Sequence, residues 1–214
     1  LGYFRNANQV WLKKGNSPVS EADLSVNDYL HSALLGRFPS CGWLSEETAD
    51  DPARLRNNQI FVVDPIDGTR GFLEGNAQWC ISLALVRDSR PVAAVLHCPA
   101  LDRTFSAAIG LGAWLNGFRI IPHADDEIVR VTGSKRLNDD IGRQYPGRFT
   151  ILPYVPSLAY RLAMVATGEL DAAFARGGSH DWDLAAADLI LSEAGGRMTT
   201  LAGEGLRYNQ PETR

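Results

Sequence analysis

Residues 61–72 read FVVDPIDGTRGF, and this stretch decides how the chain folds. The run over residues 60–63 is apolar and β-branched, and it stops abruptly at Asp64 and Pro65, as a buried central strand would. Pro65 fixes its own φ and biases the preceding Asp64 toward extended geometry. The sequence therefore predicts a strand whose exit presents two carboxylates, Asp64 and Asp67, toward one point.

Such a pair of acids favours a metal site. Two carboxylates held close in a half-buried pocket raise each other's pKa and stay protonated unless a cation offsets their charge. Carboxylate oxygens suit Mg²⁺ or Mn²⁺ rather than zinc, and neither an HExxH nor a CxxC motif accompanies them. A helix that begins at Gly68 and Thr69 would add backbone amides that favour a phosphate. On spacing alone, the alternative is a solvated Asx turn that caps a short helix.

The remaining pattern predicts a mixed fold. Ser20 followed by Asp23 is a capping signal for a first helix, and Asp181 is expected to cap a last helix with Asp183 in its first turn. We expect helices over 20–36, 157–168 and 181–193, and further strands over 79–86, 91–97, 104–108 and 170–174.

A compositional shift at residues 122–126 suggests two halves. We expect an N-terminal α+β half over 1–122, which carries the DPIDGT turn, and a C-terminal α/β half over 123–214. The two halves are expected to form one compact unit.

Bulk composition excludes several classes of partner. The 214 residues carry a net charge of −4, and their Lys and Arg are scattered, so no basic face is expected for a nucleic acid polymer or an anionic membrane. No apolar stretch approaches the ~18 to 20 residues of a membrane span. Three widely spaced cysteines fit reduced, buried thiols in a cytoplasmic protein better than a disulfide framework.

Three motifs, in order, resemble the inositol monophosphatase superfamily. They are WLSEET at 43–48, DPIDGT at 64–69 and HDWDLAAAD at 180–188, the last followed by EAGG. The resemblance extends from about residue 17 to the end of the chain. It implies an α+β fold arranged as a layered αβαβα sandwich, a homodimer, and metal-dependent removal of a phosphate ester from a small polyol or nucleotide, often inhibited by lithium.

The resemblance also implies which residues form the site. The expected metal ligands are Glu46, Asp64, Asp67, Asp183 and the main-chain carbonyl of Ile66, which would hold two or three Mg²⁺ ions, with Mn²⁺ as an alternative. Glu46, Asp67 and the Thr69 hydroxyl are expected to be catalytic, with water as the nucleophile. The amides of Gly68 and Thr69 are expected to hold the phosphate oxygens.

Three further residues have two interpretations each. Asp23 resembles an acid near the metals, but it equally fits a helix cap. Glu47 is expected to have a solvated, outer-shell role, and the alternative is direct ligation of a metal. His180 could touch the substrate, and the alternative is an exposed loop imidazole.

Two arginines bear on the substrate. Arg176 stands where inositol monophosphatases usually carry a Glu that accepts hydrogen bonds from hydroxyls, and a guanidinium donates but cannot accept. Arg161 stands where related 3'(2'),5'-bisphosphate nucleotidases carry a Lys. Both favour a second anionic group, although surface salt bridges are the alternative. The candidate substrates are inositol monophosphate and a bisphosphate nucleotide, with histidinol phosphate behind them. A non-catalytic regulatory binding protein on the same fold is the competing hypothesis.

Overall fold

A seven-stranded sheet forms the centre of the computed structural model, which describes residues 1–13, 15–121, 129–133, 135–175 and 177–213. Within this seven-stranded sheet, β3 and β4 pair in parallel, and each later pair of neighbouring strands is antiparallel. In order across the sheet, the strands are β3 (Gly42–Ser45), β4 (Gln59–Asp67), β5 (Cys80–Arg87), β6 (Arg90–Cys98), β7 (Arg103–Ala108), β8 (Gly112–Leu115) and β9 (Phe118–Arg119).

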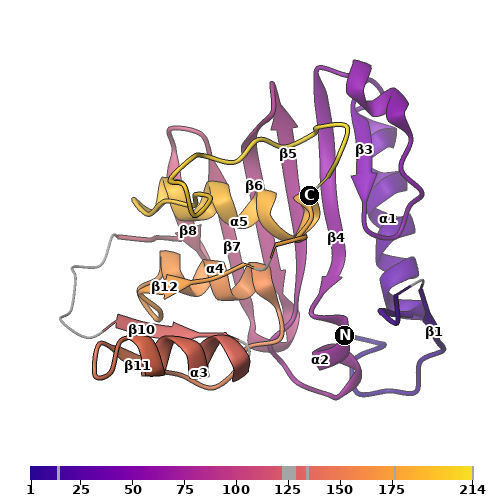
Figure 1. The fold of residues 1–214 in the computed structure, drawn as a ribbon. Coiled ribbons are helices and arrows are strands. Elements are labelled where there is room, and N and C mark those ends of the chain that lie inside the picture. Colours follow the sequence, from indigo (N-terminus) through magenta and orange to yellow (C-terminus); the bar gives the residue numbers. More distant parts are fainter. Residues whose placement is uncertain (14, 122–128, 134, 176, 214) are drawn as a thin grey trace.

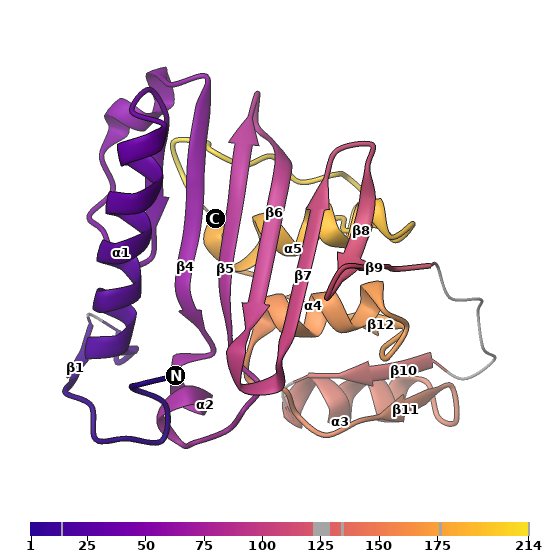
Figure 2. The same cartoon turned by 180° about the vertical axis from the view of Figure 1, so that it is seen from behind.

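Helices and a second sheet build layers on both sides of the central sheet (Figure 1). Helix α1 (Glu21–Arg37) covers β3 and β4 on one face, and Figure 2 shows the other strands of that face without a helix in front of them. The opposite face carries α4 (Leu158–Ala166) and α5 (Asp181–Glu193). Beyond α4 lie a parallel sheet and α3 (Lys135–Gln144). The strands of that sheet, in spatial order, are β11 (Phe149–Ile151), β10 (Val129–Thr132) and β12 (Ala172–Ala173). This arrangement confirms the expected αβαβα sandwich.

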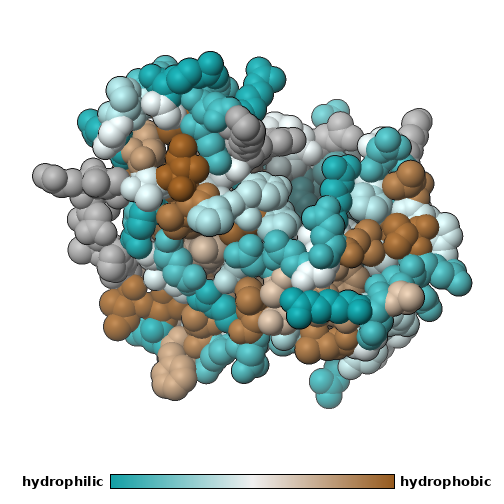
Figure 3. Space-filling model, turned by 90° about the horizontal axis from the view of Figure 1, so that it is seen from below, coloured by the Kyte–Doolittle hydropathy of each residue, from teal (hydrophilic) through white to brown (hydrophobic). Residues whose placement is uncertain are grey.

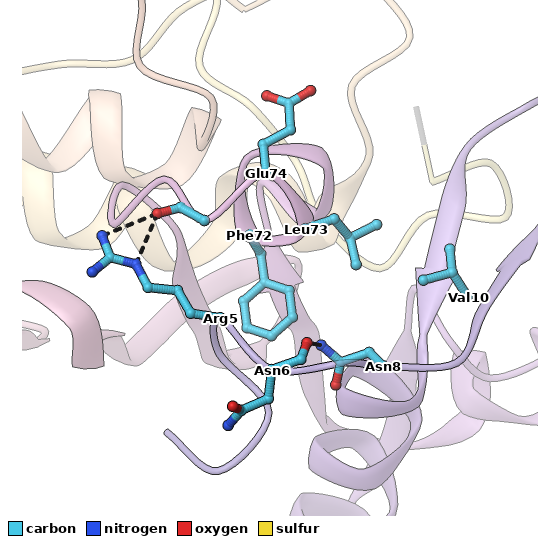
Figure 4. Close-up of a pocket in the computed structure, with 8 residues that line it drawn as sticks. Arg5, Asn6, Asn8, Val10, Phe72, Leu73 and Glu74 are labelled. Carbon is cyan, nitrogen blue, oxygen red and sulfur yellow. Dashed lines mark hydrogen bonds between the residues drawn. The ribbon is translucent and has the colours of Figure 1, made fainter.

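Short elements complete the chain. They are β1 (Val10–Leu12), β2 (Pro18–Ser20), α2 (Thr69–Leu73) and the 3₁₀ turns at Pro52–Arg56 and Pro99–Leu101. The N-terminal segment is tied to the end of α2, because Arg5 Nε and Nη2 donate to the Gly75 carbonyl at 3.2 and 3.1 Å. A hollow of about 510 Å³ lies beside this contact. Figure 4 shows residues that line the hollow, with the hydrogen bonds of Arg5 as dashed lines. Figure 3 views the molecule from below, where hydrophobic residues gather in several clusters between hydrophilic ones.

The main core lies between the central sheet and α4 and α5. Side chains alternate across β6, so that Leu96 is completely buried while Val95 on the other face is 36% exposed. Leu96 and Phe105 belong to one cluster with small residues of the two helices, such as Ala163 and Ala186. Small side chains let these helices lie close to the sheet, which positions their N-termini beside the end of β4.

Most sequence expectations for the elements are confirmed, with small shifts. The capping box at Ser20 and Asp23 is present, with the Ser20 amide 2.8 Å from Asp23 Oδ2. The predicted cap at Asp181 is wrong, because His180 is the N-cap and Asp181 is already helical. The Asp181 carboxylate instead accepts a hydrogen bond of 2.7 Å from the Asn209 amide. The strand expected over 170–174 is limited to two residues.

Two further sequence observations have a simple outcome. The compositional shift at 122–126, with the proposed boundary between 122 and 123, lies outside the described residues, so the division into halves stays a prediction. None of the helices within the described ranges is both long and apolar enough to cross a membrane.

The alternation along β6 yields a prediction about stability. Leu96→Ala removes a fully buried side chain and should lower the free energy of unfolding by about 2–5 kcal/mol. The neighbouring Val95 lies on the uncovered face, so Val95→Ala should change the free energy of unfolding by about 0.5 kcal/mol or less. Urea unfolding followed by circular dichroism measures both values. Equal losses for the two variants would show that the two faces of the sheet are not packed as described.

Candidate metal centre

The two acids at the exit of β4 face the same side because the strand bulges there. In a regular strand, residues three apart point to opposite faces. Here Asp64 pairs with Ser82 and Asp67 pairs with Cys80, so three steps on β4 oppose two on β5. The extra residue re-aims Asp67 toward the face on which Asp64 lies. An Asx turn, in which the Ile66 amide donates to Asp64 Oδ1 at 3.0 Å, fixes the first carboxylate.

Asp67 is held by the N-terminus of α4. The Ser157 hydroxyl donates to Asp67 Oδ2 at 2.5 Å and the Ala159 amide donates to the same oxygen at 2.7 Å. Ser157 also caps the helix, since its hydroxyl accepts from the Tyr160 amide at 3.0 Å. Burial raises the pKa of Asp67 to about 6, although these hydrogen bonds and the charge of Arg161 oppose the rise. The carboxylate is therefore oriented by residues about 90 positions further along the chain.

Asp183 enters the cluster from the first turn of α5. Its Oδ2 accepts a hydrogen bond of 2.7 Å from the His180 amide, which closes the capping box of this helix. The Ser82 hydroxyl donates to the Trp182 carbonyl at 3.1 Å, so β5 fixes the backbone beside it. Burial and the nearby charge of Asp67 raise the pKa of Asp183 to about 7.

Together, the three aspartates form a compact oxygen cluster. One carboxylate oxygen from each of Asp64, Asp67 and Asp183 lies within 4.8 Å of the others. Burial, and then the charges of Glu46, Asp67 and Asp183, raise the pKa of Asp64 well above its usual range. Such a set of hard oxygen donors suits Mg²⁺ or Mn²⁺, which would relieve the repulsion among them.

Glu46 lies in the same cleft but is paired differently. Its backbone follows β3, where the Glu46 amide donates to the Val63 carbonyl at 3.2 Å. Its Oε1 lies 2.9 Å from Lys13 Nζ, and the same ammonium lies 2.6 Å from Glu47 Oε1. The expectation that Glu47 is solvated is wrong, because its side chain is only 4% exposed, and burial raises its pKa to about 7.

Asp23 confirms the expected helix cap and also contacts the DPIDGT turn. Its Oδ2 caps α1, with the Ser20 hydroxyl at 2.5 Å, while its Oδ1 lies 3.2 Å from the Thr69 hydroxyl. Thr69 is also 3.0 Å from the Ile66 carbonyl. Asp23 is completely buried, and burial raises its pKa. A helix-capping carboxylate thus reaches the predicted phosphate turn.

The cleft around these groups measures about 490 Å³, within the range of about 300–1,000 Å³ for small-molecule sites. Its lining includes all four predicted carboxylates together with Ile66, Gly68 and Thr69, and Tyr154 and Pro156 also line it. Gly68 has φ of +93°, and a Cβ there would lie 3.1 Å from the Ser157 amide nitrogen. Only glycine fits both the backbone conformation and this close approach.

The other predicted residues fall in different places. Arg161 is half-buried at the start of α4, where its Nε donates to the Ser157 carbonyl at 3.3 Å. Arg176 lies outside the described residues. His180 is no exposed loop imidazole, because it is half-buried and its ring stacks on Trp182 with centroids 4.5 Å apart.

Sequence reasoning missed Lys13 and half of the role of Ser157. Ser157 was expected only as a helix cap, yet the same hydroxyl fixes Asp67. Lys13 sits in an N-terminal segment without a metal or phosphate motif. The only signal for it would have been the need for a positive charge near the adjacent Glu46 and Glu47.

Comparisons with known proteins show the family of the chain. The model of the inositol monophosphatase family matches residues 2–213. The 3'(2'),5'-bisphosphate nucleotidase CysQ of Haemophilus influenzae is 30% identical, over 99% of this chain and 82% of the relative.

Solved structures give the same fold. The extragenic suppressor protein suhB of Bartonella henselae has a TM-score of 0.83 and 31% identity, over 95% of this chain and 81% of that chain. SaIMPase-II, solved with 2'AMP bound, has a TM-score of 0.76 and 25% identity, over 86% of this chain and 74% of that chain. It has also been solved with inositol monophosphate bound.

The raised pKa values predict how the metal-free protein responds to pH. Asp67, Asp183 and Glu47, with pKa values of about 6, 7 and 7, bind more protons in the folded than in the unfolded state between about pH 4 and 7. Folding stability should therefore fall as the pH rises through this window, because the folded protein must give up protons there.

Thermal unfolding in chelator from about pH 5 to about pH 8 measures this trend. We expect the Tm to decrease with pH, by about 2–4 °C for each kcal/mol lost, and the decrease to be smaller in Asp183→Asn. Excess Mg²⁺ should flatten it, because the ion stabilises the charged carboxylates. A Tm that rises with pH in chelator would contradict the described cluster.

Proposed function

The chain belongs to the inositol monophosphatase family, and from this premise we propose that it is a Mg²⁺-dependent phosphate monoesterase of small phosphorylated metabolites. The observation that carries the proposal is the gathering of Asp64, Asp67 and Asp183 within 4.8 Å, in a cleft that Glu46 also lines. Asp64 and Asp67 come from β4 and Asp183 comes from α5, far along the sequence, and burial opposes their charge. A structure that holds them together fits the chemistry of a divalent cation better than any packing role.

The residues that would hold the ions are Asp64, Asp67, Asp183, Glu46 and the carbonyl of Ile66. When bound, Mg²⁺ would neutralise the ester and its leaving oxygen and lower the pKa of a water molecule. Mn²⁺ has a similar preference for oxygen ligands and is the alternative ion. The proposal extends to lithium inhibition, a homodimer and a cytoplasmic location, for which the family resemblance is the support.

The chain's own side chains would orient the attacking water. Thr69 lies 3.0 Å from the Ile66 carbonyl and 3.2 Å from Asp23 Oδ1, so its single proton is drawn toward these acceptors. The hydroxyl oxygen then keeps lone pairs to accept a hydrogen bond from water. Glu46 would accept the other proton of that water, and the amides of Gly68 and Thr69 would hold the phosphate oxygens during in-line attack.

Two substrate classes remain in the proposal, inositol monophosphate and 3'(2'),5'-bisphosphate nucleotide. The family description supports the first, and the CysQ relative supports the second. SaIMPase-II has been solved with a ligand of each kind, inositol monophosphate and 2'AMP. Arg161, half-buried and close enough to lower the pKa of Asp67, adds positive charge beside the site.

Removal of one aspartate tests the reaction class. Asp67→Asn should lower the rate of phosphate release by more than about 100-fold. Loss of a residue that only hydrogen-bonds to a metal ligand already lowers metal affinity or activity by about 10- to 100-fold. The matched control is Asp188→Asn, because Asp188 is a half-buried acid of α5 that accepts from Tyr208 at 2.8 Å rather than from the cluster. Colorimetric phosphate release from each candidate ester, with Mg²⁺ or chelator, gives the answer. Equal phosphate release with Mg²⁺ and with chelator would contradict the proposal that the reaction depends on a metal.

The Thr69 hydroxyl yields a second test. Thr69→Val keeps the shape of the side chain but removes the group that would orient water, so we expect kcat to fall by about 10²- to 10⁴-fold. Thr69→Ser keeps the hydroxyl and should retain much of the activity. Steady-state kinetics with saturating Mg²⁺ separates kcat from KM. A Thr69→Val enzyme as active as Thr69→Ser would exclude the hydroxyl from the reaction.

A further inference from the structure

Tyr154 is a large aromatic residue on the wall of the metal cleft. It lies between β11 and α4, and it lines the same cleft as Asp64, Asp67 and Thr69. The residue is 54% exposed. Among the described residues, its ring contributes to neither of the two hydrophobic clusters of the core. The fold therefore does not account for an aromatic ring at this position.

Arg161 places a positive charge next to the Tyr154 ring. Its guanidinium carbon lies 5.7 Å from the centroid of Tyr154, within the range of a cation–π contact. Its Nε donates to the carbonyl of Ser157, the residue whose hydroxyl holds Asp67. The ring and the cation thus stand on the short segment that also anchors a predicted metal ligand. Tyr154 therefore shares one cleft with the acids that would hold the ions.

An aromatic ring backed by a cation at the rim of a phosphate site suits a flat, π-rich group better than a cyclitol. Every nucleobase has a π-face that stacks on an aromatic side chain, whereas a cyclitol presents only C–H groups and hydroxyls. The guanidinium adds positive charge where a second phosphate of a nucleotide would be stabilised. The cleft is also lined by Arg70, which is exposed and donates to the Asn16 carbonyl at 3.1 Å.

We propose that Tyr154, supported by Arg161, is a specificity-determining residue that stacks on the base of a nucleoside phosphate, so that the substrate class of this cleft is a nucleotide rather than a cyclitol phosphate. The inference rests on the proposed phosphatase function for the reaction, but the stacking itself is a binding property. It assigns Tyr154 no part in the chemistry at phosphorus. Its removal should therefore raise KM for nucleotides and leave kcat for small esters unchanged.

The test compares three esters and three variants. The esters are adenosine 3',5'-bisphosphate, inositol 1-phosphate and glycerol 2-phosphate, and the variants are Tyr154→Leu, Tyr154→Phe and Tyr29→Leu. Tyr29 is an exposed tyrosine of α1, so its replacement controls for loss of a surface aromatic. Tyr154→Leu should raise KM for the adenosine ester about tenfold, within the range of about 5- to 150-fold for one base stack. It should change kcat/KM for glycerol 2-phosphate less than about twofold, and Tyr154→Phe should behave as the unaltered protein.

Equilibrium binding of adenosine 3',5'-bisphosphate, measured by calorimetry with Mg²⁺, separates the two proposals. If no ester is hydrolysed but Tyr154→Leu still weakens binding about tenfold, the stacking role stands and the phosphatase function fails. If esters are hydrolysed but Tyr154→Leu leaves nucleotide binding and KM unchanged, the stacking role is overturned. Equal losses on all three esters would also overturn it, because they would indicate a general structural effect.

Discussion

Repulsion among buried carboxylates is the constraint on which the rest of this structure depends. Asp64, Asp67 and Asp183 each lie in a place where burial alone disfavours their charge. The charge of Glu46 adds to this effect at all three, and the charge of Asp67 adds to it at Asp64 and Asp183. Flexible acids would turn away from one another into water. They stay together because each one accepts a hydrogen bond from a backbone amide in a turn or at a helix N-terminus. The donor to Asp64 lies in the Asx turn, the donor to Asp67 at the start of α4, and the donor to Asp183 at the start of α5.

The protein supplies only part of the opposing charge itself. Lys13 lies between Glu46 and Glu47, so one ammonium serves two carboxylates on the side of the cleft formed by the end of β3. On the side formed by α4, Arg161 lowers the pKa of Asp67 but does not cancel the effect of burial. The pKa values of the three aspartates therefore remain raised, because the nearby cationic side chains do not offset burial and repulsion. A divalent cation of small radius is the group that offsets them without occupying the space needed by an ester.

The sequence predicted which acids gather in the cleft, but only part of the local structure and not what surrounds the acids. Proline and glycine constrain φ locally, so DPIDGT predicted the turn, yet β4 continues past the expected stop at Asp64 to Asp67 through a bulge. Neither β10 nor α3 was predicted. The capping residue of α5 was placed one position late, because the Asp181 carboxylate has a distant partner at Asn209 that no spacing reveals. The contact of Lys13 with Glu46 and the position of Tyr154 in the cleft both arise from tertiary packing. The prediction that Glu47 is solvated was wrong for the same reason, because Lys13 and the surrounding chain bury its side chain.

The same arrangement links stability to ligand binding. A cluster of acids that is unfavourable without a cation lowers the free energy of unfolding near neutral pH, and the central sheet has to supply the difference through its apolar contacts with α4 and α5. Those two helices do both jobs, because their buried faces are rich in alanine while their N-termini hold Asp67 and carry Asp183. A substitution in this part of the core would therefore shift the N-termini as well as the packing. Metal affinity and folding stability should change together for core residues of α4 and α5, and independently for residues on the uncovered face of the sheet.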